Sequence, residues 1–91
     1  MKPEDRLAEL RRASQESTFD FLVIELDLIE TFHALAISTN DPQRRTGLVR
    51  KMKIALGTVR QFEGRIEDAN ARQQIHDRAD FLEPLISKFG E

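Results

Sequence analysis

Residues 19–37 read FDFLVIELDLIETFHALAI and form the most apolar stretch of the chain. In a helical conformation apolar side chains would cover most of its circumference, and a helix of that kind needs neighbours on several sides. Four acidic residues interrupt the stretch, and each would cost roughly 2.5 kcal/mol or more at the centre of a bilayer. The stretch is therefore predicted to be the central helix of an all-α fold and not a membrane span.

The apolar pattern of this helix extends toward the N-terminus without a change of phase. Pro3 suits a first helical position. From there, residues recur at alternating three- and four-residue spacing, which is typical of a helix: Leu7, Leu10, Ser14, Ser17, Phe21, Ile24, Leu28, Thr31 and Leu35. The spacing predicts one long helix over residues 3–38. A break near Ser17 is the alternative, because Ser17 and Thr18 are residue types that cap a new helix.

A second helix is predicted over residues 42–66. The segment Ser38-Thr39-Asn40-Asp41-Pro42 reads as a turn, because Asn or Asp can cap a helix and Pro42 can occupy its first position. The following apolar residues have a strict four-three-four-three-four spacing, which predicts a narrow packed stripe: Leu48, Met52, Ala55, Val59, Phe62 and Ile66.

A third helix is predicted over residues 71–89. Its apolar residues have helical spacing but lie out of phase with the preceding stripe, so a turn is expected between residues 67 and 71: Ile75, Ala79, Leu82, Ile86 and Phe89. Asp68 or Asn70 can cap this helix. Pro84 is expected to kink it or to start a terminal turn.

Together these segments predict one helical domain over residues 1–91, a small antiparallel bundle of three helices. A chain of 91 residues buries a modest share of its surface, so oligomerisation is a natural supplement. The first predicted helix is also longer than its neighbours, and its excess length could pack against a second copy. We therefore expect a homodimer.

Composition excludes several classes of function. The chain has no cysteine, which removes disulfides and thiolate chemistry and fits a cytoplasmic location. The formal net charge of -2 gives the whole molecule no strong attraction to nucleic acid or to an anionic membrane.

The central helix supplies the candidate interface residues. Glu25 would lie among apolar residues on a helical wheel, where a carboxylate needs a partner. It is interpreted as half of an ion pair with an arginine of another helix or subunit, with a general acid or base as the alternative. The expected interface residues are Phe21, Leu22, Glu25, Ile29, Phe32 and Ala36.

Charge is distributed unevenly between the first two helices. Residues 17–38 hold four acids and no Lys or Arg, whereas seven Lys and Arg residues lie between residues 44 and 65. The simplest interpretation is complementarity, with the acidic and basic helices side by side. The alternative is a nucleic-acid surface formed by Arg50, Lys53 and Arg60, which would share one face of the second helix.

One short motif suggests a metal. Glu30-Thr31-Phe32-His33 has the Glu-x-x-His spacing by which ferritin-like bundles hold two metal ions. A full site needs further glutamates and a second such pair, which only a second chain could supply. No other catalytic or cofactor signature is present. The sequence thus favours a non-enzymatic helical interaction module without a cofactor, with nucleic-acid binding and metal dependence as alternatives.

Overall fold

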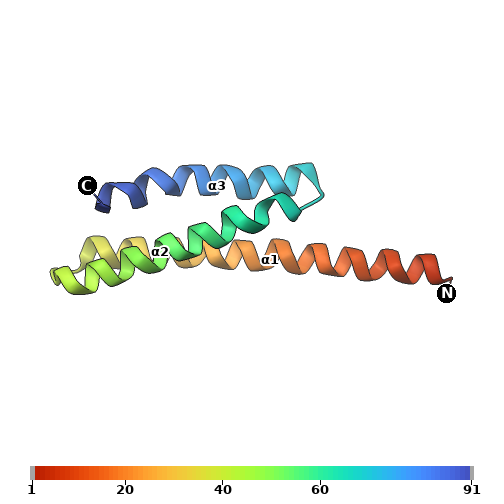
Figure 1. Ribbon diagram of the computed structural model, residues 1–91, viewed down its shortest axis with the longest axis horizontal. Coiled ribbons are helices and arrows are strands. Elements are labelled where there is room, and N and C mark those ends of the chain that lie inside the picture. Colours follow the sequence, from red (N-terminus) through yellow and green to blue (C-terminus); the bar gives the residue numbers. More distant parts are fainter. Residues whose placement is uncertain (1, 91) are drawn as a thin grey trace.

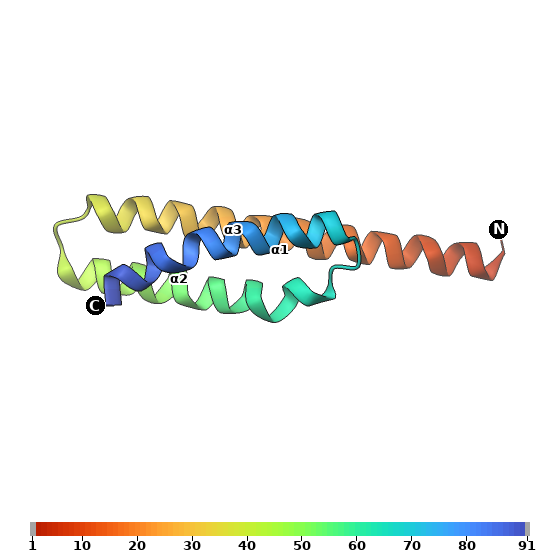
Figure 2. The same ribbon diagram turned by 90° about the horizontal axis from the view of Figure 1, so that it is seen from above.

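A computed structural model describes residues 2–90 as three α-helices with two short 3-10 turns (Figure 1). The elements in order are α1 (Pro3–Ser38), α2 (Pro42–Phe62), η1 (Glu63–Arg65), α3 (Ala69–Ser87) and η2 (Lys88–Gly90). α2 runs back along α1, and α3 returns over the line between the two, as the view from above shows (Figure 2). The predicted all-α bundle of three helices is confirmed.

The first helix is continuous, so the alternative of a break near Ser17 is wrong. The hydroxyl of Thr18 donates to the carbonyl oxygen of Ser14, one turn earlier, at 3.0 Å. This bond lies within the helix, where a side-chain hydroxyl can satisfy itself on the preceding turn and need not cap a new helix.

The turn between α1 and α2 has the predicted chemistry. The carboxylate of Asp41 accepts hydrogen bonds from the backbone N–H groups of Gln43 at 2.9 Å and Arg44 at 3.4 Å, and Pro42 is the first residue of α2. Arg45 donates to the carbonyl oxygens of Ala36 and Thr39, which are left without helical partners at the end of α1. This arginine fastens the start of α2 to the end of α1.

The turn between α2 and α3 differs in part from the prediction. α2 ends at Phe62 instead of residue 66, because η1 tightens the chain and Ile66 takes an extended conformation. Asp68 caps α3, as one of the two predicted candidates, by accepting from the N–H of Ala71 at 2.8 Å. α3 thus begins at Ala69 and ends at Ser87 with Pro84 inside it, and η2 takes up the remaining residues to Gly90.

Residues from all three helices form one hydrophobic core. The core face of α1 is narrow and buried, with Leu22, Leu26, Ile29 and Ala36 fully inaccessible. The predicted stripes of the other two helices meet it there, and the buried residues are Leu48, Val49, Met52, Ala55, Leu56, Val59, Ile66, Ile75, Ala79, Leu82 and Ile86.

α1 is longer than the two helices that cover it. It has 36 residues against 21 in α2 and 19 in α3, and its N-terminal part projects beyond both in the two views (Figures 1 and 2). The molecule is accordingly elongated, at 59 × 19 × 16 Å. None of the described helices is long and apolar enough to cross a membrane.

Candidate interaction surface

The regular stripe of α1 that starts at Leu7 faces solvent over its whole length. We call it the outer seam, and its nine residues are Leu7, Leu10, Ser14, Ser17, Phe21, Ile24, Leu28, Thr31 and Leu35, all of them exposed. Exposure is greatest at Leu7 (66%), Leu10 (60%) and Ile24 (57%). Six of the nine are apolar, with Ser14, Ser17 and Thr31 between them, and an exposed stripe of this kind is a candidate interaction site.

The outer seam and the core face lie on different sides of α1. At about 100° per residue, the outer seam is centred about 120° around the helix from the buried leucines and isoleucine. Its three- and four-residue alternation is a heptad repeat. On a straight helix the direction of such a stripe drifts by about 20° per heptad, and the stripe stays in contact with a partner helix when the two helices supercoil. The seam therefore has the spacing of a coiled-coil contact.

Charged residues flank the outer seam in two separate groups. Arg6 and Arg11 lie beside its N-terminal half, with Glu4 one heptad before Arg11, whereas Asp20, Glu25 and Asp27 lie beside its C-terminal half. These are the positions next to the apolar pairs of a heptad repeat, where charge sets partner choice and orientation. The two halves of the seam thus carry opposite charge.

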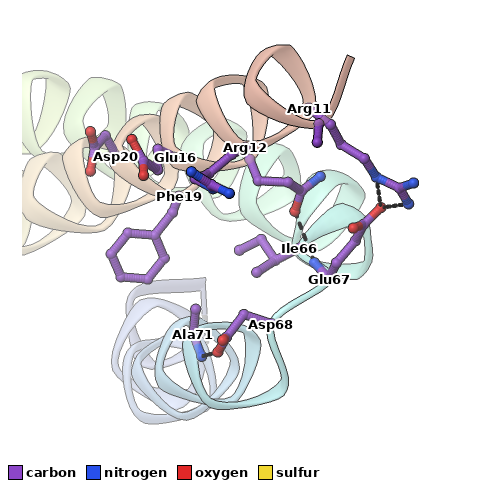
Figure 3. Close-up of a pocket in the computed structure, with 11 residues that line it drawn as sticks. Arg11, Arg12, Glu16, Phe19, Asp20, Ile66, Glu67, Asp68 and Ala71 are labelled. Atoms are coloured by element: carbon purple, nitrogen blue, oxygen red, sulfur yellow. Dashed lines mark hydrogen bonds and ion pairs between the residues drawn. The ribbon is translucent and has the colours of Figure 1, made fainter. Parts of the chain in front are cut away.

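A groove lies where the projecting part of α1 leaves the bundle (Figure 3). Its volume is about 690 Å³, and Phe19, Ile66 and Ala71 supply its apolar lining. The turn between α2 and α3 closes one side, held to α1 because Arg11 pairs with the Glu67 carboxylate. The Gln15 side-chain oxygen also accepts from the Glu67 N–H, at 2.9 Å. These contacts fix the direction in which α1 projects.

The structure divides the predicted interface residues between the core and the surface. Leu22, Ile29 and Ala36 are fully buried within the chain's own core, so none of the three is available to a partner. Phe21 is exposed on the outer seam, and the remaining two, Glu25 and Phe32, are half-buried at its border.

The sequence links the long stripe from Leu7 to a continuous helix and to self-association, but it places the expected interface residues between Phe21 and Ala36. The expected interface does not include Leu7, Leu10 and Ile24, although these are the most exposed apolar residues of the outer seam. The helix contains two heptad patterns, that of the outer seam and that of the buried residues. Because a single bundle core covers only one pattern, the presence of a second could have indicated these exposed residues.

The acidic helix α1 and the basic helix α2 lie side by side, as the sequence predicts, but the acids of α1 form their ion pairs with α3. Arg78 of α3 donates to Asp27 at 2.9 Å and to Glu30 at 3.0 Å. Among the described residues, no ion pair joins an acid of residues 17–38 to a base of α2. On that side, Lys51 instead lies over the ring of Phe32, with its nitrogen 5.7 Å from the ring centre.

The candidate nucleic-acid residues differ in their surroundings. Arg50 and Lys53 are exposed on α2, whereas Arg60 is half-buried and engaged by carboxylates. Its guanidinium lies 3.3 Å from Glu63, 2.6 Å from Asp80 and 3.6 Å from Glu83.

The two residues of the Glu-x-x-His motif have different contacts. Glu30 accepts from Arg78, and the ring of His33 meets Phe89 edge to face at a centroid distance of 5.6 Å. Within residues 2–90 no three His, Asp or Glu side chains come together as a metal site.

His76 belongs to a charged cluster on α2, η1 and α3 that is separate from the outer seam. Its Nδ1 lies 3.0 Å from a Glu63 oxygen and its Nε2 lies 3.2 Å from an Asp80 oxygen. The hydrogen bond to Glu63, with the charge of Asp80, raises the pKa of His76 above its ordinary value, although Arg60 opposes the shift. A hydrogen bond from Arg60 lowers the pKa of Asp80.

This cluster predicts a pH-dependent contribution of His76 to stability. Because the pKa of His76 is higher in the folded than in the unfolded chain, its contribution is complete below about pH 6.5 and is lost as the pH rises through the folded value. We expect His76→Gln to lower the free energy of unfolding more at about pH 5.5 than at about pH 8.5. Urea unfolding of both proteins at the two pH values tests this, and an equal loss at both would contradict it.

Comparison of the chain with models of protein families, with curated proteins and with solved structures finds no match.

Proposed function

We propose that this chain is a non-enzymatic helical interaction module that associates with a second copy of itself through the outer seam of α1. One observation carries the proposal: the nine residues of the outer seam, which occupy the two contact positions of successive heptads on a single 36-residue helix, are all exposed. Burying such a stripe against another helix removes apolar surface from water, which is the main driving force of most protein association.

A second copy is the partner that this face fits best. Most soluble oligomers are symmetric homo-oligomers, and a two-fold axis pairs a surface with itself. Basic groups flank one half of the seam and acidic groups flank the other. Two copies that run in opposite directions therefore bring groups of opposite charge together. The absence of cysteine fits a role in the reducing cytoplasm.

The two alternative functions have less support. Nucleic-acid binding would need Arg60, whose guanidinium is engaged by the carboxylates of Glu63, Asp80 and Glu83. Metal binding would need Glu30 and His33, and both side chains have other contacts within the chain.

Replacement of one seam residue by an acid tests the proposal. We expect Ile24→Asp to weaken self-association about 100-fold or more, because the substitution removes an apolar side chain that the contact would bury and places a charge there instead. Light scattering over a concentration series measures the effect.

Ile54→Asp is the matched control. Ile54 is 64% exposed on α2, close to the 57% of Ile24, but it lies outside the seam. This variant is expected to associate as the unaltered protein does. Equal association of both variants would show that the outer seam is not the contact.

A further inference from the structure

We propose that the two copies pair antiparallel, in one register, over residues 7–24 of α1. This inference rests on the proposed function and adds the orientation and alignment of the partner. Three features of the outer seam carry it: the order of large and small residues, the position of the flanking charges, and the gradient of exposure along the helix.

The order of large and small residues selects one antiparallel register. In an antiparallel pair the second helix runs in the opposite direction. Two residues that lie at the same level form one layer of the contact. The two stripes face each other along their length only when the residue numbers in every layer add up to the same sum. With a sum of about 31, which the heptad positions allow, large residues meet large and small meet small. Leu7 then lies beside Ile24 of the second copy, Leu10 beside Phe21, and Ser14 beside Ser17.

A shift by one heptad in the antiparallel pair spoils this match. Leu7 would then meet Thr31 of the second copy, and Ser17 would meet Phe21. A further shift by one heptad places Leu7 beside Ser38. Each of these layers buries a hydroxyl against an apolar side chain, which costs free energy unless the hydroxyl finds a hydrogen-bond partner.

The flanking charges disfavour a parallel pair on electrostatic grounds. In a parallel pair each half of the seam meets its own counterpart, which brings Arg6 near Arg11 and Asp20 near Glu25. In the antiparallel register Arg6 instead faces Asp27 and Asp20 of the second copy, about two and five residues from its own level. On the other flank Glu25 is about five residues from the level of Arg11 and about two from that of Glu4. Charges of opposite sign then meet on the flank of Arg6, while on the other flank Glu25 faces both Arg11 and Glu4.

Charged side chains that flank the seam are available for ion pairs with a second copy. Within the described chain, Arg6, Asp20 and Glu25 form no ion pair. Arg11 is bonded to Glu67, yet its side chain is 71% exposed and its remaining donors are accessible.

Exposure along the seam agrees with a contact limited to residues 7–24. Leu7, Leu10 and Ile24 are 57–66% exposed, whereas Leu28 (39%) and Leu35 (38%), which lie beyond the contact, are the least exposed large seam residues. The serines at 14 and 17 fall at the two-fold axis, where small side chains permit close approach of the two helices. The projecting end of each α1 then lies against the middle of the other.

A single spin label on each chain tests the arrangement, because the chain has no cysteine of its own. Asp5 is exposed and points away from the seam, so Asp5→Cys offers a labelling site outside the contact. In the proposed register the two labels are offset by about 32 Å along the axis. With about 25 Å across the pair, their separation is about 40 Å.

Other arrangements give other distances between the labels. A parallel pair has almost no axial offset and a separation of about 25 Å, and a shift by one heptad gives about 50 Å or about 33 Å, depending on its direction. Either result, measured by pulsed electron resonance, would overturn the register proposed. The labelled Ile24→Asp variant is the control and should show no distance between chains. Absence of a distance in the labelled protein itself, with a monomer mass, would instead overturn the proposed function.

Charge reversal is a second test, because it changes the dimer affinity in opposite directions for the antiparallel and the parallel pair. Arg6→Glu should weaken the antiparallel dimer, and adding Asp20→Arg should restore most of the loss, because the pair is then reversed and not removed. In a parallel pair Arg6→Glu would place a glutamate beside Arg11 and strengthen association. Strengthening by the single substitution would therefore overturn the antiparallel arrangement.

Discussion

Replacing Leu26 with alanine is expected to lower the free energy of unfolding by about 2 to 5 kcal/mol. Leu26 is fully inaccessible on the core face of α1 and belongs to the cluster formed by all three helices. Its truncation loses the transfer free energy of the buried atoms and leaves a cavity that neighbouring side chains fill only in part.

Leu28→Ala is the matched control for this substitution. Leu28 is two residues away on the same helix but 39% exposed on the outer seam, outside the proposed contact. The same chemical change should therefore cost much less, about 1 kcal/mol or below. Both variants are best measured by urea unfolding in the Ile24→Asp background, because dimer formation would otherwise add to the apparent stability. Equal losses would contradict the assignment of the two faces of α1.

Replacing Ser17 with proline is expected to abolish self-association. Proline removes a backbone N–H and clashes with the carbonyl of the residue four positions earlier, at a cost of about 3 kcal/mol or more within a helix. Ser17 lies inside α1 and inside the proposed contact, so a bend there separates Leu7 and Leu10 from the rest of the seam. The contact then loses the layers that Leu7 and Leu10 form with the second copy, and we expect the dissociation constant to rise about 100-fold or more.

Ser17→Ala is the control at the same position. Alanine is small and favours helix, so this variant should keep the association of the unaltered protein. Both variants should retain the bundle, because the buried residues of α1 begin at Leu22. Light scattering reports association, and circular dichroism reports helix content. A dimer of undiminished affinity in Ser17→Pro would show that the N-terminal half of the seam takes no part in the contact.

The helices themselves could be predicted well because local chemistry determines them. The alternating spacing from Leu7 to Leu35 has no phase break, and α1 is continuous. Asp41 and Pro42 combine a capping carboxylate with a first-position proline, and α2 begins at Pro42. The end of α2 was predicted four residues late because the regular apolar spacing of this helix continues from Val59 and Phe62 to Ile66. α2 ends at Phe62, and after η1 Ile66 takes an extended conformation and enters the core.

The division of α1 into two faces could not be predicted in the same way. Residues 19–37 are apolar around most of the helix, so the sequence does not show which side the other helices cover. That choice depends on how α2 and α3 pack, and it buries Leu22 and Ile29 while exposing Ile24. The rotation of the helices also decides that Arg78 of α3, and no base of α2, pairs with the acids of α1.

The mass of the unaltered protein in solution tests the central claim most directly. Light scattering or sedimentation equilibrium should be followed as the chain concentration rises to roughly 100 µM, a range that detects dissociation constants in the micromolar region. If the outer seam joins two copies, the mass will rise to twice the 10.5 kDa of one chain. A mass that stays at 10.5 kDa throughout the series would contradict the account.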